Sequence, residues 1–171
     1  MKLLSTIAGA SIAAGLIGVG AAWAKAPEFV SIPIEIIVNR PAADVWSKVG
    51  GFCDLSKWLA AGREVPCQIT SGKGEVGTVR TIAGRVVEVM TAKTEFGYGY
   101  AQPAVEGQWY NHYHGFVEAR AVNATTSKII YTLMLDVSDK TDQAAKDADI
   151  AGRKKQFEAA LANMKKIAEG G

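Results

Sequence analysis

The spacing of apolar residues changes along this chain, and each change predicts a different kind of element. Between Ile32 and Val38 apolar side chains hold every second position, which predicts a β-strand with its even-numbered positions facing inward. A helix opening at Pro41 and a second, shorter helix ending at Gly62 are predicted next, because apolar stripes recur there at helical spacing. The stripes are made by Val45, Trp46 and Val49, and by Leu55, Trp58 and Leu59.

Alternating apolar residues separated by short glycine-containing connections predict six further strands, which are antiparallel neighbours. Their ranges are 66–71, 75–82, 86–92, 94–101, 109–122 and 127–137. From residue 139 to 168 the spacing becomes helical, with apolar residues at Ile150, Phe157, Leu161, Met164 and Ala168. We therefore expect an α+β fold in which a curved, seven-stranded antiparallel sheet wraps a long C-terminal helix and encloses an internal pocket.

One hairpin can be placed in register from the sequence. If Ala83-Gly84-Arg85 forms its loop, Arg80 lies directly opposite Glu88 on the neighbouring strand. Opposite charges that face each other across two strands favour this register. Arg80 and Glu88 are then either a structural pair or a pair at the edge of the pocket.

The first residues have the layout of a secretory signal peptide. Lys2 is followed by an uncharged run from Leu3 to Gly20 and by the small-residue triplet Ala22-Trp23-Ala24. We expect cleavage after Ala24, export to the periplasm and a single domain over 25–171. The alternative is that an uncleaved segment 1–24 anchors the protein in a membrane.

The composition and one motif indicate that neither nucleic acid nor a nucleotide is an expected partner. A formal net charge of +2 with no basic stripe gives no footprint for nucleic acid. The motif G-x-G-x-x-G at Gly72–Gly77 precedes β-branched residues rather than a helix, so we interpret it as a hairpin loop and not as a nucleotide site. Cys53 and Cys67 form a disulfide in an oxidising compartment, or are two buried thiols.

Candidate chemistry concentrates on the strand 109–122. Tyr110, His112, His114 and Phe116 share one face of it, and Trp109, Tyr113 and Val117 share the other. Glu118 and Arg120 indicate that the even-numbered face is exposed to solvent at the C-terminal end of the strand, but the sequence leaves open which face lines the pocket. We predict no metal site, because these two histidines are the only ones in the chain. Tyr98, Tyr100 and Tyr131 add phenols that either face the pocket or merely pack the sheet.

The sequence resembles the polyketide cyclase/dehydrase branch of the START-like, birch-pollen-allergen-like superfamily. The resemblance rests on the motifs Asn39-Arg40-Pro41-Ala42-Ala43-Asp44-Val45-Trp46, Phe52-Cys53-Asp54-Leu55-Ser56-Lys57-Trp58 and Tyr98-Gly99-Tyr100, and covers nearly all of the chain after residue 24. It implies the helix-grip fold with a pocket for a small apolar or aromatic ligand. Relatives often have His-Pro where this chain has Leu59-Ala60, so the pocket mouth is expected to differ.

Two functions follow as hypotheses. The first is an enzyme of lyase, cyclase or isomerase type without cofactor or metal, in which His112 or His114 is the general base and Tyr98 and Tyr131 polarise an oxygen. The second is a non-catalytic carrier of a hydrophobic ligand, or an accessory protein of an exported oxidoreductase. A filled core without ligand is a third, weaker reading. The residues expected to contact a ligand are Trp58, Arg80, Glu88, Tyr100, Tyr110, Tyr113, Phe116, Phe157 and Leu161.

Overall fold

The computed structural model describes residues 26–60, 63–104 and 112–171, so the predicted signal peptide and Tyr110 lie outside the described residues. The described chain begins with β1 (Phe29–Val38), followed by two short helices, α1 (Ala42–Val49) and α2 (Leu55–Trp58). The other strands are β2 (Cys67–Ser71), β3 (Val79–Ile82), β4 (Val86–Thr94), β5 (Gly97–Ala101), β6 (His114–Ala121) and β7 (Ser127–Asp136). The chain ends in the long helix α3 (Gln143–Glu169).

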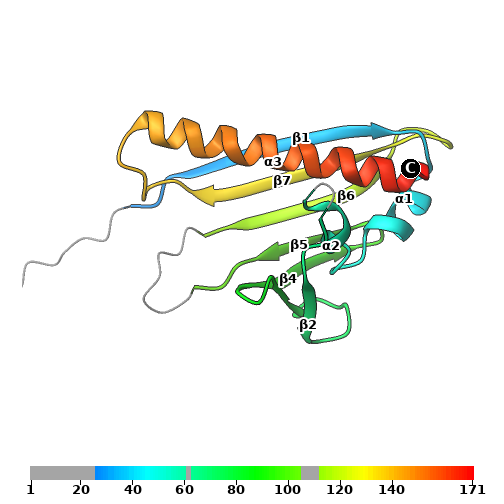
Figure 1. The fold of residues 1–171 in the computed structure, drawn as a ribbon, viewed down its shortest axis with the longest axis horizontal. Coiled ribbons are helices and arrows are strands. Elements are labelled where there is room, and N and C mark those ends of the chain that lie inside the picture. Colours follow the sequence, from blue (N-terminus) through cyan, green and yellow to red (C-terminus); the bar gives the residue numbers. More distant parts are fainter. Residues whose placement is uncertain (1–25, 61–62, 105–111) are drawn as a thin grey trace, which may run out of the picture.

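The seven described strands form one antiparallel sheet in the order β1-β7-β6-β5-β4-β3-β2. β1 and β2 are its two edges, so the sheet is not closed. Helix α3 lies along β1 and β7, and α1 packs against it near its C-terminal end (Figure 1). This arrangement confirms the predicted α+β helix-grip fold, with two short helices after the first strand.

Local sequence explains where the helices begin and end. The Asp142 side chain accepts a hydrogen bond from the Ala145 backbone N–H at 2.8 Å and caps the start of α3. Gly170, with a φ of 94°, ends α3 in the left-handed conformation that glycine favours. Gly50 follows the last residue of α1, and a Cβ there would lie 2.3 Å from Cδ2 of Trp46, so glycine is the residue that fits this position.

The core lies between α3 and the inner face of the sheet. In β1 the even-numbered Ile32, Ile34 and Val38 are buried, as the alternation predicts. The β3–β4 hairpin has the predicted register, with Arg80 directly opposite Glu88.

Some boundaries differ from the expectation. The strand expected from residue 75 begins at Val79, because Gly72, Gly74 and Gly77 all have positive φ and hold the preceding segment in a loop. This confirms that the glycine motif is a hairpin loop and that no helix follows it. The strand expected from residue 109 is extended, in its described part, only from His114 on. The φ of 47° at His112 interrupts the extended backbone.

Candidate functional site

A cavity of about 200 Å³, called here the first cavity, lies between α3, the α2 region and the concave face of the sheet. Its lining combines aromatic, aliphatic and polar side chains. The lining residues are Leu55, Trp58, Leu59, Arg80, Ile82, Val86, Glu88, Tyr100, Gln102, Tyr113, Tyr131, Arg153, Gln156 and Phe157.

A buried ion pair forms part of this lining. Arg80 and Glu88 are only 2% and 4% exposed. Arg80 Nη2 lies 2.6 Å from Glu88 Oε2, and Arg80 Nε donates to the same oxygen at 2.8 Å. Gln102 Nε2 donates to the other carboxylate oxygen, Oε1, at 3.2 Å. Both oxygens of the Glu88 carboxylate are therefore hydrogen-bonded, as a buried charge requires.

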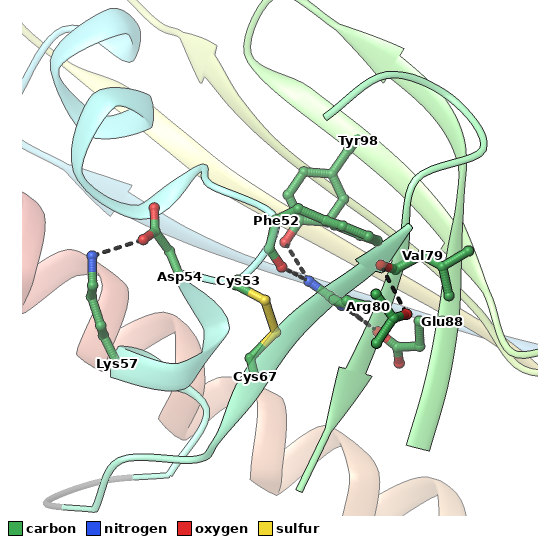
Figure 2. The surroundings of a disulfide bond; sticks show 10 residues. Phe52, Cys53, Asp54, Lys57, Cys67, Val79, Arg80, Glu88 and Tyr98 are labelled. Carbon is green, nitrogen blue, oxygen red and sulfur yellow. Dashed lines mark hydrogen bonds and ion pairs between the residues drawn. A yellow bond between two sulfur atoms is a disulfide. The ribbon is translucent and has the colours of Figure 1, made fainter. Parts of the chain in front are cut away.

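Arg80 also connects the sheet to the loop before α2. Its Nη1 donates to the Phe52 carbonyl oxygen and, at 3.4 Å, to the Tyr98 hydroxyl (Figure 2). The guanidinium carbon lies 4.1 Å from the centre of the Phe52 ring and 5.0 Å from that of Tyr100, which are cation–π distances. Burial alone lowers the pKa of Arg80, but the potential of Tyr98 and Glu88 outweighs it, so the pKa is raised and the guanidinium stays charged.

Three phenols line the same cavity. The hydroxyl oxygens of Tyr100 and Tyr131 lie 2.7 Å apart and share a hydrogen bond. Burial raises the pKa of both groups well above the ordinary value, and it raises the pKa of Tyr113 to about 12. These hydroxyls therefore keep their protons at neutral pH and act as hydrogen-bond donors. Tyr98 is buried as well, but it lines a different cavity.

Helix α3 contributes Arg153, Gln156 and Phe157 to the lining. Arg153 is held by Asp149, one turn earlier, through an ion pair of 3.2 Å, and its guanidinium carbon lies 5.2 Å from the centre of the Tyr113 ring. The Phe157 ring packs against Tyr131, with 4.8 Å between ring centroids. Since these residues are spaced along one face of the helix, α3 supplies both an aromatic surface and a cation.

The structure does not bring the two histidines to the first cavity. Tyr113, the residue before β6, and the odd-numbered Val117 and Ala119 of β6 are buried, so the even-numbered face of β6 points away from the core. His112 is exposed and its ring packs edge-on against Phe29, with 5.7 Å between centroids. His114 pairs with Met134 of β7, and burial followed by the charge of His112 lowers its pKa. The inward face, which the sequence left open, is therefore the one with Tyr113 and Val117, and His112 and His114, the candidate bases, do not line the first cavity.

Two further expected ligand contacts lie elsewhere. Phe116 is on the same outer face as His114 and is half-buried, so it does not face the cavity. Leu161 is 1% exposed and packs in the core instead of lining the cavity. Tyr110 was also expected to contact the ligand, and it lies outside the described residues.

Several residues of the lining were not predicted from the sequence, although the sequence carried signals for some of them. Gln102 stands two positions after Tyr100 and directly follows the last residue of β5, so continued alternation places it on the face of Tyr100. Arg153 stands four positions before Phe157, which places both on one face of α3. Ile82 stands two positions after Arg80 on β3, so the same alternation places both residues on the inner face of the sheet.

Arg80, Glu88, Phe52 and Tyr98 are called here the Arg80 cluster, and a disulfide lies beside it. Cys53, next to Phe52 in the chain, is bonded to Cys67 of β2, with 5.5 Å between the Cα atoms (Figure 2). Cys67 is paired with Ile82 across the β2–β3 ladder. The bond therefore ties the loop that carries the Phe52 carbonyl to the edge strand β2, which is paired with β3, the strand that carries Arg80.

Two other kinds of feature are absent from the part of the chain that the structure describes. No three or more His, Cys, Asp or Glu side chains gather there in a group able to hold a metal ion. No helix there combines the length and the apolar character needed to cross a bilayer.

Comparison with known proteins agrees with this fold. Residues 30–169 match the model of a family described as polyketide cyclase / dehydrase and lipid transport. Among solved structures, the chain is similar to the Zhui aromatase/cyclase from Streptomyces sp. R1128, with a TM-score of 0.64 and 16% identity over 83% of this chain and 94% of that one. It is also similar to Ara h 8.0201, with a TM-score of 0.61 and 17% identity over 84% and 100% of the two chains.

A protein from Nitrosospira multiformis is similar too, with a TM-score of 0.58 and 22% identity over 79% of this chain and 96% of that one. Identities this low establish a shared fold and nothing more specific. Among the curated proteins compared, none matches the chain.

Proposed function

Because the chain belongs to the polyketide cyclase / dehydrase and lipid transport family, we propose that its first cavity binds one small molecule with an aromatic or apolar body and an oxygen that accepts hydrogen bonds. The observation that carries this proposal is the pair of hydroxyls of Tyr100 and Tyr131, which are buried beside the aromatic and aliphatic part of the lining. One hydroxyl donates to the other, and the accepting hydroxyl keeps its own proton to donate. A ligand oxygen is a suitable acceptor for it.

The volume limits the size of the ligand. A cavity of roughly 150 Å³ accommodates a benzene molecule, so the 200 Å³ found here suits a ligand of one or two rings. Trp58 and Phe157 supply aromatic surfaces for such rings, and both pack against Tyr131.

The binding proposal is tested with two matched probes, the aromatic ketone tetralone and its oxygen-free analogue tetralin. Tyr131→Phe removes the hydroxyl and keeps the ring, so we expect tetralone to bind roughly five- to tenfold more weakly and tetralin to bind unchanged. The control is a variant with His112→Ala and His114→Ala, which should bind both probes like the unaltered protein. Equal loss of both probes in Tyr131→Phe, or loss of tetralone binding only in the histidine variant, would contradict the proposal.

The natural ligand is sought by native mass spectrometry of the protein purified from its own host, compared with the denatured mass. A retained compound with a ring system and an oxygen acceptor is expected. A retained compound with a long alkyl chain and no ring would contradict the size and shape argued here.

A second candidate, cyclase-type catalysis, is favoured by the Glu88 carboxylate, which lines the cavity together with the phenols. Ring closure of a poly-β-ketone requires a base that removes a proton beside a carbonyl and donors that polarise a carbonyl oxygen. In this candidate Glu88 accepts the proton, and Tyr100 or Tyr131 donates to the oxygen. Glu88→Gln is then expected to abolish ring closure while tetralone still binds. Undiminished ring closure in this variant would exclude Glu88 as the base.

Export to the periplasm also remains a proposal. The disulfide between Cys53 and Cys67 supports it, because such bonds persist in oxidising compartments. The test is N-terminal sequencing of the protein from the periplasmic fraction, which should begin at Lys25. A full-length protein starting at Met1 in the membrane fraction would favour the uncleaved anchor.

A further inference from the structure

A second cavity, of about 300 Å³, lies on the other side of the Arg80 cluster. Phe52 and Tyr98 line it, and both also contact Arg80, which lines the first cavity. Figure 2 shows these three side chains close together. The residues that line the second cavity are Trp46, Gly50, Gly51, Phe52, Gly74, Met90, Lys93, Gly97 and Tyr98.

Aromatic rings form the wall of this second cavity. The ring of Tyr98 lies 5.7 Å from that of Trp46 and 5.2 Å from that of Phe52, measured between centroids. The flexible thioether side chain of Met90, which is 3% exposed, completes the apolar surface. A flat aromatic molecule can stack or pack edge-on against such walls.

An irregularity of the sheet brings a cation to the same place. The β4–β5 ladder shifts register between Met90 and Ala92, and beyond this β-bulge Lys93 is directly opposite Tyr98. Directly paired residues share a face of the sheet, so Lys93 joins Tyr98 on the concave side. Without the bulge, strict alternation after Glu88 and Met90 would place Lys93 on the outer face. Bulges of this kind re-aim side chains and are frequent beside functional sites.

Lys93 is the only charged side chain among the described residues that line the second cavity. Its ammonium group donates one hydrogen bond to the Gly74 carbonyl oxygen, which holds it at the loop that borders the cavity. An ammonium group has three protons to donate, so this bond leaves capacity for an anionic ligand.

We propose that the second cavity is a separate binding site for a small planar aromatic carboxylate, with its rings against Trp46, Phe52 and Tyr98 and its carboxylate at Lys93. The site goes beyond the proposed function, which concerns the first cavity. A volume of 300 Å³ is about twice that of a benzene-sized cavity, which suits two fused rings with a carboxylate. Naphthoate is therefore the appropriate probe.

Titration calorimetry with naphthoate tests the proposal. Lys93→Met keeps the length of the side chain and removes its charge, so we expect naphthoate to bind roughly five- to tenfold more weakly. Lys73→Met is the matched control. Lys73 is exposed, lies next to Gly74 in the loop that borders the cavity, and does not itself line the cavity, so naphthoate binding should be unchanged in this variant. The neutral analogue naphthalenemethanol should bind the unaltered protein and the Lys93→Met variant equally.

NMR locates the probe on the unaltered protein. Naphthoate should shift the amide signals of Gly74 and Gly97 and the methyl signal of Met90. It should still bind to the Tyr131→Phe variant, which separates this site from the first cavity. The proposal is overturned by the absence of saturable binding, by equal affinities of the Lys93→Met and Lys73→Met variants, or by shifts confined to residues around Tyr131 and Phe157.

Discussion

Removing the Glu88 carboxylate should destabilise the fold much more than its single ion pair suggests. Arg80 and Glu88 are 2% and 4% exposed, and two hydrogen-bonded contacts of 2.6 Å and 2.8 Å join them. In Glu88→Leu the Arg80 guanidinium stays buried and charged, with the Phe52 carbonyl and the Tyr98 hydroxyl as its remaining described acceptors. Breaking a buried pair in this way costs about 3–5 kcal/mol. For a domain of this size that lowers the melting temperature by roughly 10 °C.

Urea denaturation followed by circular dichroism measures this loss of stability. Two control variants test whether it comes from the buried charge of Arg80. Glu35→Leu breaks the pair with Lys128, at 2.8 Å on the same sheet, but that Glu35 side chain is 56% exposed, so the cost should stay below about 1 kcal/mol. The double variant Arg80→Met, Glu88→Leu removes both charges and should recover most of the loss. A Glu88→Leu cost as small as that of Glu35→Leu, or a double variant no more stable than the single one, would refute the reasoning.

Two further predictions concern the phenols and the disulfide. The pKa of Tyr113, raised by burial to about 12 in the fold, exceeds that of an unfolded tyrosine at about 10, so its contribution to stability is complete below about pH 10 and is lost as the pH rises through 12. In an alkaline titration the phenolate absorbance of Tyr113, isolated by difference against Tyr113→Phe, should rise only above pH 10; ionisation at pH 10 in the folded protein would contradict this. Replacing Cys53 and Cys67 by serine removes a bond that closes a loop across 14 positions, so the free energy of unfolding should fall by about 3 kcal/mol. Urea denaturation measures this change. An unchanged midpoint would show that the disulfide contributes no stability.

The parts of the fold that the sequence could predict are those decided by local periodicity. Alternation in β1 placed Ile32, Ile34 and Val38 inward, and the helical spacing after residue 139 predicted α3. The register of the β3–β4 hairpin followed from its short loop, because a turn of fixed length leaves few ways to pair the strands. That register alone was enough to find Arg80 and Glu88.

The face of β6 was not predictable, because both faces carry aromatic residues and alternation alone cannot choose between them. The choice depends on contacts far away in the chain. Val117 pairs with Tyr98 of β5 and with Tyr131 of β7, and all three side chains are buried. The inward face of β6 is therefore the one that completes a layer with its two neighbours. The charged Glu118 on the opposite face was the local hint of this outcome.

Lys93 illustrates a second limit. A pattern with a period of two residues predicts its orientation only while the register holds, and the bulge after Met90 reverses it. Nothing in the local composition marks the bulge, because Thr91 and Ala92 are ordinary strand residues. An irregularity that depends on the pairing of two whole strands thus determines which side of the sheet receives the cation.

The chemistry of the first cavity differs from the expected imidazole chemistry because of the face that β6 and the residue before it turn inward. Tyr113 faces inward and neither histidine lines the cavity, so the groups brought together are phenols, two guanidinium groups and a carboxylate. Burial keeps the protons on Tyr100, Tyr113 and Tyr131 at neutral pH, so these hydroxyls donate hydrogen bonds without changing charge. A site of this kind holds or polarises a ligand oxygen equally well across the physiological pH range. Of the described residues that line the first cavity, Glu88 is the one with a carboxylate. Its two oxygens are bonded to Arg80 and Gln102, so a proton transfer to Glu88 would act directly on the buried pair that stabilises the fold.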